Sequence, residues 1–213
     1  MEFLTADKGD FTTEIKRSEF IGKLVKVNSE EEAKSFINSV KKEHSLATHN
    51  CYAYIVYDDG VERVRYSDDG EPQGTAGVPV LEVLQKRGLT DVCVVVTRYF
   101  GGILLGGGGL LRAYSHAASI ACDAAHIMDM RLCHRLAIKT DYNLYGKINY
   151  ILPNFDVITV NSDFADAVTL EILVMSEKLD ALRKELTEVT NDSAEVTDLG
   201  ELYEDFSSVM TNF

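Results

Sequence analysis

The sequence of 213 residues has no apolar run long enough to cross a bilayer, which takes about 20 consecutive apolar residues. Its first ten residues, MEFLTADKGD, lack the basic, apolar and small-residue order of a secretory signal. Both absences lead us to expect a cytoplasmic protein that makes no membrane contact.

Cysteine is scarce, and its four positions form no Cys-x-x-Cys pair. A closed zinc site needs clustered ligands, and a secreted disulfide framework has a denser set of cysteines. We therefore expect reduced thiols, no metal and no cofactor. The four cysteines are Cys51, Cys93, Cys122 and Cys133.

Positive charge is also in deficit, since 21 Lys and Arg stand against 34 Asp and Glu and give a net charge of −13. This excess of negative charge disfavours broad electrostatic capture of nucleic acid. The deficit is uneven: residues 1–131 carry a net −4 and residues 132–213 a net −9. A surface that binds anions is therefore expected in the first part of the chain.

Hydrophobic spacing in residues 1–131 predicts alternating strands and helices. Ser29 and Glu32 form a capping box that starts a helix ending near Lys42. The unbroken apolar run 92–96 is typical of a strand covered on both faces. Strands are predicted at 20–27, 51–57, 61–66 and 92–96, and further helices at 78–86 and 110–125.

Residues 132–213 follow a second pattern. Asp141 is placed to cap a helix that Pro153 stops, and Ser176 is placed to cap another. The predicted order is strand, helix, strand, strand, helix, strand, which is the ferredoxin-like unit. We place the boundary after Arg131, giving domains 1–131 and 132–213. Strands are predicted at 132–140, 155–160 and 167–175, with a weak one between 194 and 209.

A glycine-rich run joins the apolar strand at 92–96 to the next helix. Glycines before a helix let backbone N–H groups approach an anion, and arginines beside them supply forked donors. The run matches neither a P-loop nor a dinucleotide fingerprint, and it could instead let an alanine-rich helix pack tightly. The candidate anion-binding residues are Arg98, Gly101, Gly102, Gly106, Gly107, Gly108, Gly109, Arg112 and His116.

An acidic loop precedes this run and carries Asp68, Asp69 and Glu71. These carboxylates could bind Mg²⁺, but we favour ion pairs with Arg98 and Arg112 across one cleft.

A third cluster, His44, His49 and Cys51, permits a thiol hydrolase, because residues 49 and 51 of a strand project from the same face. It lacks a cysteine protease signature, so we disfavour it.

These segments resemble the YigZ/IMPACT family over most of residues 16–116. The matching motifs are Lys16-Arg-Ser-Glu-Phe20, His49-Asn-Cys-Tyr-Ala53, Asp68-Asp-Gly-Glu-Pro72, Gly74-Thr-Ala-Gly77-Val-Pro79 and the run Arg98–Tyr114. One departure is that the family pattern has a threonine or similar residue where this chain has Gly107 or Gly108.

The resemblance implies an α+β protein in two parts. The first domain would share the βαβ-type fold of the second domain of a small-subunit ribosomal protein. The second, ferredoxin-like domain would be similar to the last domain of elongation factor G. Eukaryotic members of the family look like regulators of translation, and short bacterial members suggest binding to nucleic acid or the ribosome.

Three functions remain open. The leading one is a regulator that binds the ribosome, an RNA or a translation-related protein through its first domain. The second is a hydrolase or transferase acting on a phosphorylated or carboxylated small molecule at the glycines, and the third is an adaptor using the acidic second domain. The absence of a clear general base or nucleophile favours a protein without catalysis. The candidate nucleic-acid contacts are Arg98, Tyr99, Phe100, Lys41 and Lys42.

Overall fold

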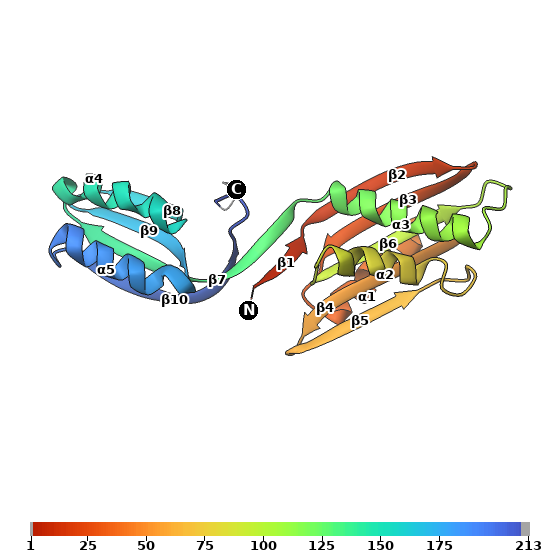
Figure 1. The fold of residues 1–213 in the computed structure, drawn as a ribbon, viewed down its shortest axis with the longest axis horizontal. Helices are drawn as coiled ribbons and strands as arrows, with labels where there is room; N and C mark the ends of the chain where they lie inside the picture. The colour runs from red at the N-terminus through yellow and green to blue at the C-terminus, as the bar shows by residue number, and fades with distance from the viewer. Residues whose placement is uncertain (1, 210–213) are drawn as a thin grey trace. The chain divides into compact units, whose positions relative to one another are not determined.

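The computed structural model describes residues 2–209 of the chain. It divides into two compact units, the first comprising residues 3–128 and the second residues 129–209 together with Glu2. Each unit is a sheet covered by helices (Figure 1). No helix within residues 2–209 is both long enough and apolar enough to span a membrane.

The sheet of the first unit has the strand order β2-β3-β6-β4-β5, and all neighbours in it are antiparallel. Before it comes the short strand β1 (Phe3–Ala6), whose Leu4 makes a parallel bridge to Leu89. The strands of the sheet are β2 (Lys8–Ile15), β3 (Ser18–Lys26), β4 (His49–Asp58), β5 (Val61–Ser67) and β6 (Val92–Tyr99).

Strand β2 is absent from the sequence-based prediction. Its sequence, KGDFTTEI, has no apolar alternation, because it is an edge strand in which only Gly9 is buried. Gly9 and Gly22 let a helix lie directly on β2 and β3. A Cβ at Gly9 would come within 1.9 Å of the Ala121 carbonyl oxygen, and one at Gly22 within 2.6 Å of the Ala117 carbonyl oxygen.

Helices cover both faces of this sheet. Helix α1 (Glu30–Glu43) packs on the face that carries Cys93 and Val95. Helices α2 (Gly77–Lys86) and α3 (Gly107–Asp123) pack on the opposite face, over Val92, Val94 and Val96. The prediction that residues 92–96 form a strand buried on both faces is therefore confirmed.

The predicted cap of α1 is also confirmed. The Ser29 Oγ accepts a hydrogen bond from the Glu32 N–H at 3.2 Å. The Glu32 carboxylate reaches back and accepts from the Asn28 N–H at 2.7 Å. Two N–H groups at the helix start are thereby satisfied.

The second unit forms an antiparallel sheet whose strands follow the order β10-β7-β9-β8. With helices α4 and α5 between the strand pairs, this is the predicted ferredoxin-like fold. Its buried core includes Leu136, Ile172 and Leu182. The elements are β7 (Ile127–Thr140), α4 (Tyr142–Ile151), β8 (Ile158–Phe164), β9 (Val168–Met175), α5 (Leu179–Thr190) and β10 (Glu195–Asp205).

One detail of this unit differs from the prediction. Asp141 caps α4 as expected, accepting from the Leu144 N–H at 3.0 Å. Ser176, however, does not cap α5: residues 176–178 form a short 3₁₀ turn, and the helix starts at Leu179 without a side-chain cap. The proposed boundary after Arg131 falls inside β7, which begins at Ile127.

Candidate functional site at the glycine-loop end of the first unit

Several loops of the first unit meet at one end of its sheet. Strands β3 and β4 begin there and β6 ends there, because their neighbours in the sheet run antiparallel. Hydrogen bonds join the loops: the Phe100 N–H donates to the Thr48 Oγ1 at 3.0 Å, and the Gly101 N–H donates to the Ser18 Oγ at 3.3 Å. Helices α2 and α3 also begin at this end, so their N-termini and the glycines lie together.

A buried ion pair between Arg98 and Glu71 forms the base of the site. The Arg98 Nη1 donates to the Glu71 Oε1 at 2.6 Å, and the Tyr114 hydroxyl donates to the same oxygen at 2.8 Å. The Arg98 Nη2 donates to the Ser18 Oγ at 3.2 Å. Burial, with Cys51 and Glu71 adding to it, raises the pKa of Tyr114, so its hydroxyl stays protonated and donates.

This network confirms the predicted pairing of Arg98 with the acidic loop, whereas Arg112 makes no ion pair with that loop among residues 2–209, so the Arg112 half of the prediction is wrong. The network also gives Arg98 a partner within the protein, so this guanidinium is not a free cation for an external anion or nucleic acid. Arg98 is 4% exposed, its guanidinium is bonded to Glu71, and it lies 5.4 Å and 5.3 Å from the ring centres of Phe20 and Phe100. Its charge is therefore used to join β3, β6, α3 and the acidic loop.

The two aspartates of the acidic loop have separate partners. Asp68 caps α2, accepting from the N–H groups of Gly74, Ala76 and Gly77 at 2.8–3.0 Å. Asp69 pairs with Lys41 at 2.6 Å and accepts from the Asn50 N–H at 2.7 Å. Within residues 2–209, no group of three or more His, Cys, Asp or Glu side chains is arranged to hold a metal ion.

The geometry disfavours Cys51 as a nucleophile. Its side chain is fully buried, and its Sγ donates to the Asp68 carbonyl at 2.9 Å. Burial raises the pKa of the Cys51 thiol to about 12, so little thiolate forms at neutral pH. His49 directs its Nδ1 to the Asp69 carbonyl at 2.9 Å. A thiol hydrolase built on this pair is thus unsupported.

The glycines of the run differ in their roles. Gly101 packs against the turn between β2 and β3, since a Cβ there would lie 1.8 Å from the Arg17 carbonyl oxygen. Gly102 and Gly106 have φ angles of +82° and +73°, and a Cβ on either would meet no described atom within 4 Å. A Cβ on Gly107 would come no nearer than 4.0 Å to any described atom. Most of these glycines therefore leave backbone open at the start of α3, and the close packing of α3 comes from Gly9 and Gly22.

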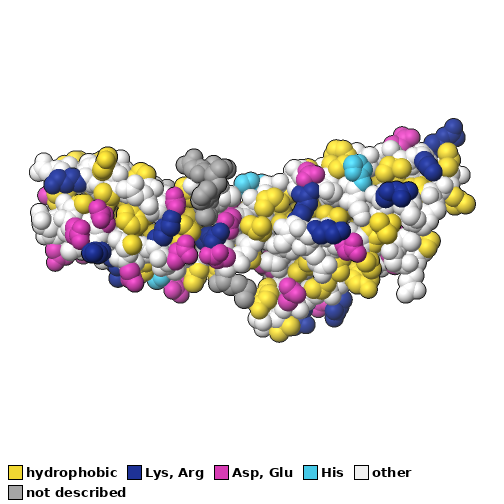
Figure 2. Space-filling model, viewed as in Figure 1, with side chains coloured by type: hydrophobic (Ala, Val, Ile, Leu, Met, Phe, Trp, Pro, Cys, Tyr) yellow, Lys and Arg dark blue, Asp and Glu magenta, His cyan; other side chains and the backbone are white. Residues whose placement is uncertain are grey.

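Four Lys, Arg and His side chains in the β2–β3 turn and on α3 have no hydrogen bond or ion pair with residues 2–209: Lys16, Arg17, Arg112 and His116. We call them the free cation group. Three of them, Lys16, Arg112 and His116, line a pocket of about 470 Å³, which we call the cation pocket. Figure 2 shows Lys, Arg and His side chains among hydrophobic ones over the end where β2 and β3 meet.

Sequence reasoning found Arg112 and His116 but missed Lys16 and Arg17 as site residues. The register of β2 and β3 makes these two residues the whole of a hairpin turn, with φ angles of 49° and 64°. Such turns favour Asn-Gly, so Lys-Arg gives no turn signal in the sequence. The only available signal was the Lys16-Arg-Ser-Glu-Phe20 motif of the family resemblance.

A second pocket, of about 410 Å³, adjoins the cation pocket and shares Leu105 with it. We call it the apolar pocket, because most of its wall is hydrophobic. Phe100 and Leu104 remain 44% and 83% exposed at its edge. It is lined by Thr48, His49, Gly70, Glu71, Pro72, Arg98, Phe100, Leu104, Leu105, Gly106, Gly107 and Leu110.

The remaining predicted nucleic-acid contacts do not gather with Arg112. Lys41 is paired with Asp69, and Lys42 is exposed on α1, which covers the other face of the sheet from α3. The Tyr99 hydroxyl lies 3.0 Å from the His44 Nδ1. Phe100 alone of this set stands open beside the free cation group.

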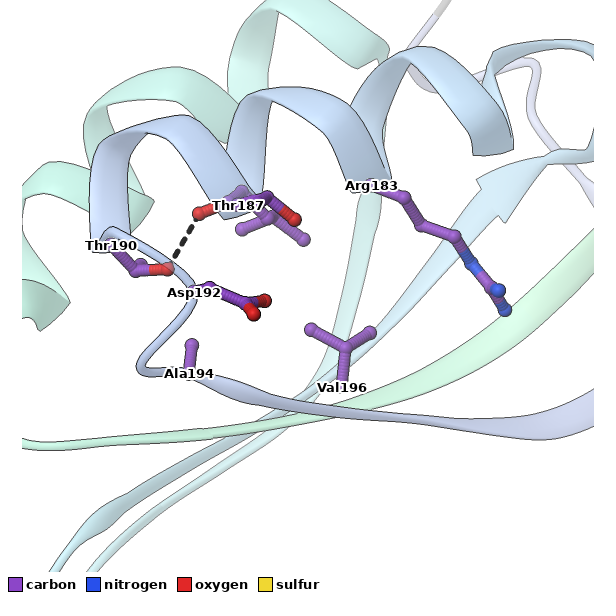
Figure 3. Close-up of a pocket in the computed structure, with 7 residues that line it drawn as sticks. Arg183, Thr187, Thr190, Asp192, Ala194 and Val196 are labelled. Atoms are coloured by element: carbon purple, nitrogen blue, oxygen red, sulfur yellow. Dashed lines mark hydrogen bonds between the residues drawn. The ribbon is translucent and has the colours of Figure 1, made fainter.

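The second unit has a smaller pocket, of about 220 Å³, at the C-terminus of α5 (Figure 3). Two of its polar side chains are already bonded: the Thr190 Oγ1 donates to the Leu186 carbonyl at 2.7 Å, and Arg183 pairs with Asp198 at 2.8 Å. We therefore place the candidate site in the first unit.

Comparisons with known proteins match both parts of the chain. Residues 16–122 match the Impact N-terminal domain, and residues 138–193 match a domain of unknown function, DUF1949. The IMPACT family member YvyE of Bacillus subtilis is 40% identical over 201 residues, covering 94% of this chain and 91% of its own. YigZ of Escherichia coli is 34% identical, covering 86% and 90%. A crystal structure of a hypothetical protein, 31% identical, aligns over 93% of this chain and 98% of its own with a TM-score of 0.59.

Proposed function

Because the chain belongs to the IMPACT family, we propose that it regulates translation by binding the ribosome or an RNA through its first unit. The resemblance to translational regulators supports a role in translation, and the free cation group supports binding to the phosphates of a nucleic acid. In a chain with a net charge of −13, three Lys and Arg side chains and a histidine lie together without a partner among the described residues. Their counter-charge would come from a phosphate backbone.

The surroundings of the free cation group favour unpaired rather than duplex nucleic acid. Single-stranded segments are recognised by cations along the backbone and by apolar or aromatic side chains that stack on splayed bases. Phe100, Ile103 and Leu104 are 44%, 40% and 83% exposed in the loop that precedes α3. A loop or single-stranded tract of an RNA, including ribosomal RNA, fits this combination.

The net charge of the second unit argues against a phosphate contact there. Residues 132–213 carry a net −9, which repels a phosphate backbone. Contact through the first unit alone involves few cations, so we expect modest affinity and a shallow dependence on salt.

The test is co-sedimentation with ribosomes, and binding to labelled single-stranded RNA, at low and high salt. The double variant Lys16→Ala/Arg112→Ala should weaken binding uniformly across sequences and lower the salt slope by about one for each cation that contacts a phosphate. The matched control is Lys86→Ala/Lys184→Ala, which removes the same charge from two exposed helical pairs away from the site. If the two double variants bind RNA and ribosomes equally well, the free cation group does not contact the nucleic acid.

A further inference from the structure

The apolar pocket combines hydrophobic walls with a polar floor. Phe100, Leu104 and Leu110 contribute to the walls, while His49, Glu71 and Arg98 supply the polar groups. Pockets of this kind bind flat rings, whose orientation is then fixed by a few polar contacts. Its neighbour across Leu105 is the cation pocket, so a ring in one pocket places an attached phosphate within reach of the other.

Two hydrogen-bond acceptors face each other at this floor. The His49 Nδ1 lies 2.9 Å from the Asp69 carbonyl, which can only accept, so Nδ1 carries the proton. In the neutral imidazole, Nε2 is therefore an acceptor. It lies 3.8 Å from the Glu71 Oε2, too far for a direct hydrogen bond.

The Glu71 Oε2 is itself without a hydrogen bond to residues 2–209, because Arg98 and Tyr114 both donate to Oε1. Among residues 2–209, a carboxylate oxygen of the largely buried Glu71 and an imidazole nitrogen of His49 thus both lack a donor at one place in the pocket. A primary amino group can give one N–H to each of them.

We infer that the apolar pocket binds an unpaired nucleobase through its exocyclic amino group, as in adenine, cytosine or guanine. This inference rests on the proposed function, since it names the part of the nucleic acid that the same surface reads. Uracil and hypoxanthine have no amino group, and their single ring N–H on this edge can donate to one of the two acceptors but not to both. A buried polar group left unpaired is how a pocket rejects a near-identical ligand.

The experiment uses the full chain and fluorescence anisotropy. The probes are uridine strands of roughly eight nucleotides, a length within the range that single-strand sites cover. One strand carries a central adenosine and the other a central inosine, which keeps the two-ring system and removes the amino group. The adenosine strand should bind about 3- to 10-fold more tightly, the ratio expected for one or two hydrogen bonds.

Gly107→Leu tests the pocket itself. Gly107 lines the apolar pocket, and a Cβ there meets nothing nearer than 4.0 Å, so the variant should fold and fill the mouth of the pocket. The preference for adenosine over inosine should disappear. Gly146→Leu is the control, because Gly146 also has open space around its Cβ and lies in the second unit.

The outcomes separate the two ideas. Equal binding of the adenosine and inosine strands by the unaltered protein overturns the base pocket, while the effect of Lys16→Ala/Arg112→Ala still tests the cation contact. Failure of every strand to bind overturns the pocket, and the proposed function is overturned as well if the protein also fails to co-sediment with ribosomes. Competition by adenosine monophosphate, and not by inosine monophosphate, supports the pocket with a free nucleotide as its source.

Discussion

Replacing Arg98 with methionine should destabilise the first unit far more than a surface arginine would. Methionine keeps much of the length and apolar volume of the side chain but removes the charge. Glu71, whose side chain is 3% exposed, would then be a buried carboxylate whose remaining donor among residues 2–209 is the Tyr114 hydroxyl. Breaking a buried ion pair from one side costs about 3–5 kcal/mol.

The free energy of unfolding from urea denaturation measures this cost. Arg65→Met is the matched control: Arg65 lies 4.0 Å from Glu30 with its side chain 62% exposed, so its pair should contribute at most about 1 kcal/mol. Arg98→Met combined with Glu71→Gln should recover part of the loss, because the uncompensated charge is gone. If Arg98→Met costs no more than Arg65→Met, or if the double variant is the sum of the singles, the pair does not stabilise the unit as argued.

Three further predictions follow from burial, strand pairing and charge. The pKa of Cys51 in the folded protein, about 12, lies above its ordinary value of 9.0, so between these values the native state keeps a proton that the unfolded chain loses. The resulting contribution to the free energy of unfolding is intact below pH 9. It is lost as the pH rises from 9 towards 12, by about 1.4 kcal/mol per pH unit. Cys51→Ala should remove that part of the loss of stability at alkaline pH. If the free energy of unfolding from urea titrations falls with pH equally steeply in the variant and in the unaltered protein, the argument is wrong. Fragments cut before Ile127 should each unfold cooperatively, and residues 127–213 should be more stable than residues 132–213, which lack the pairing of Met130 and Arg131 with β10. Thermal unfolding followed by circular dichroism compares the stability of these two fragments. Fragment 1–126 should bind single-stranded RNA more tightly than the full chain, because it lacks the net charge of −9 on residues 132–213 that repels phosphate.

The sequence predicts well those elements whose signals are local. The capping box at Ser29 and Glu32 and the cap at Asp141 depend on spacing within one turn, and both are present. The apolar run of β6 predicts a strand buried on both faces, because a strand with one face in solvent would show polar residues alternating with apolar ones. The helix and strand order of the second unit follows in the same way.

The candidate site was harder to predict, because the roles of its residues depend on how deeply they are buried and on partners that are distant in the sequence. Nothing in the sequence around Arg98 separates an arginine that ends a strand at the surface from one buried against Glu71, 27 residues away. Asp68 and Asp69 are adjacent yet bond to different elements. Lys16 and Arg17 become site residues only because β2, an exposed strand without apolar alternation, pairs with β3.

The turn at Lys16 and Arg17 sets a limit on how this protein can be improved. Two consecutive side-chain-bearing residues in the left-handed region cost about 1–3 kcal/mol each, and Asn-Gly at the same place would relieve much of this strain. Selection for thermal stability alone would therefore favour the loss of two cations from the free cation group. A thermostabilised variant selected in this way would lose part of the free cation group, so its ligand binding would not represent that of the natural protein.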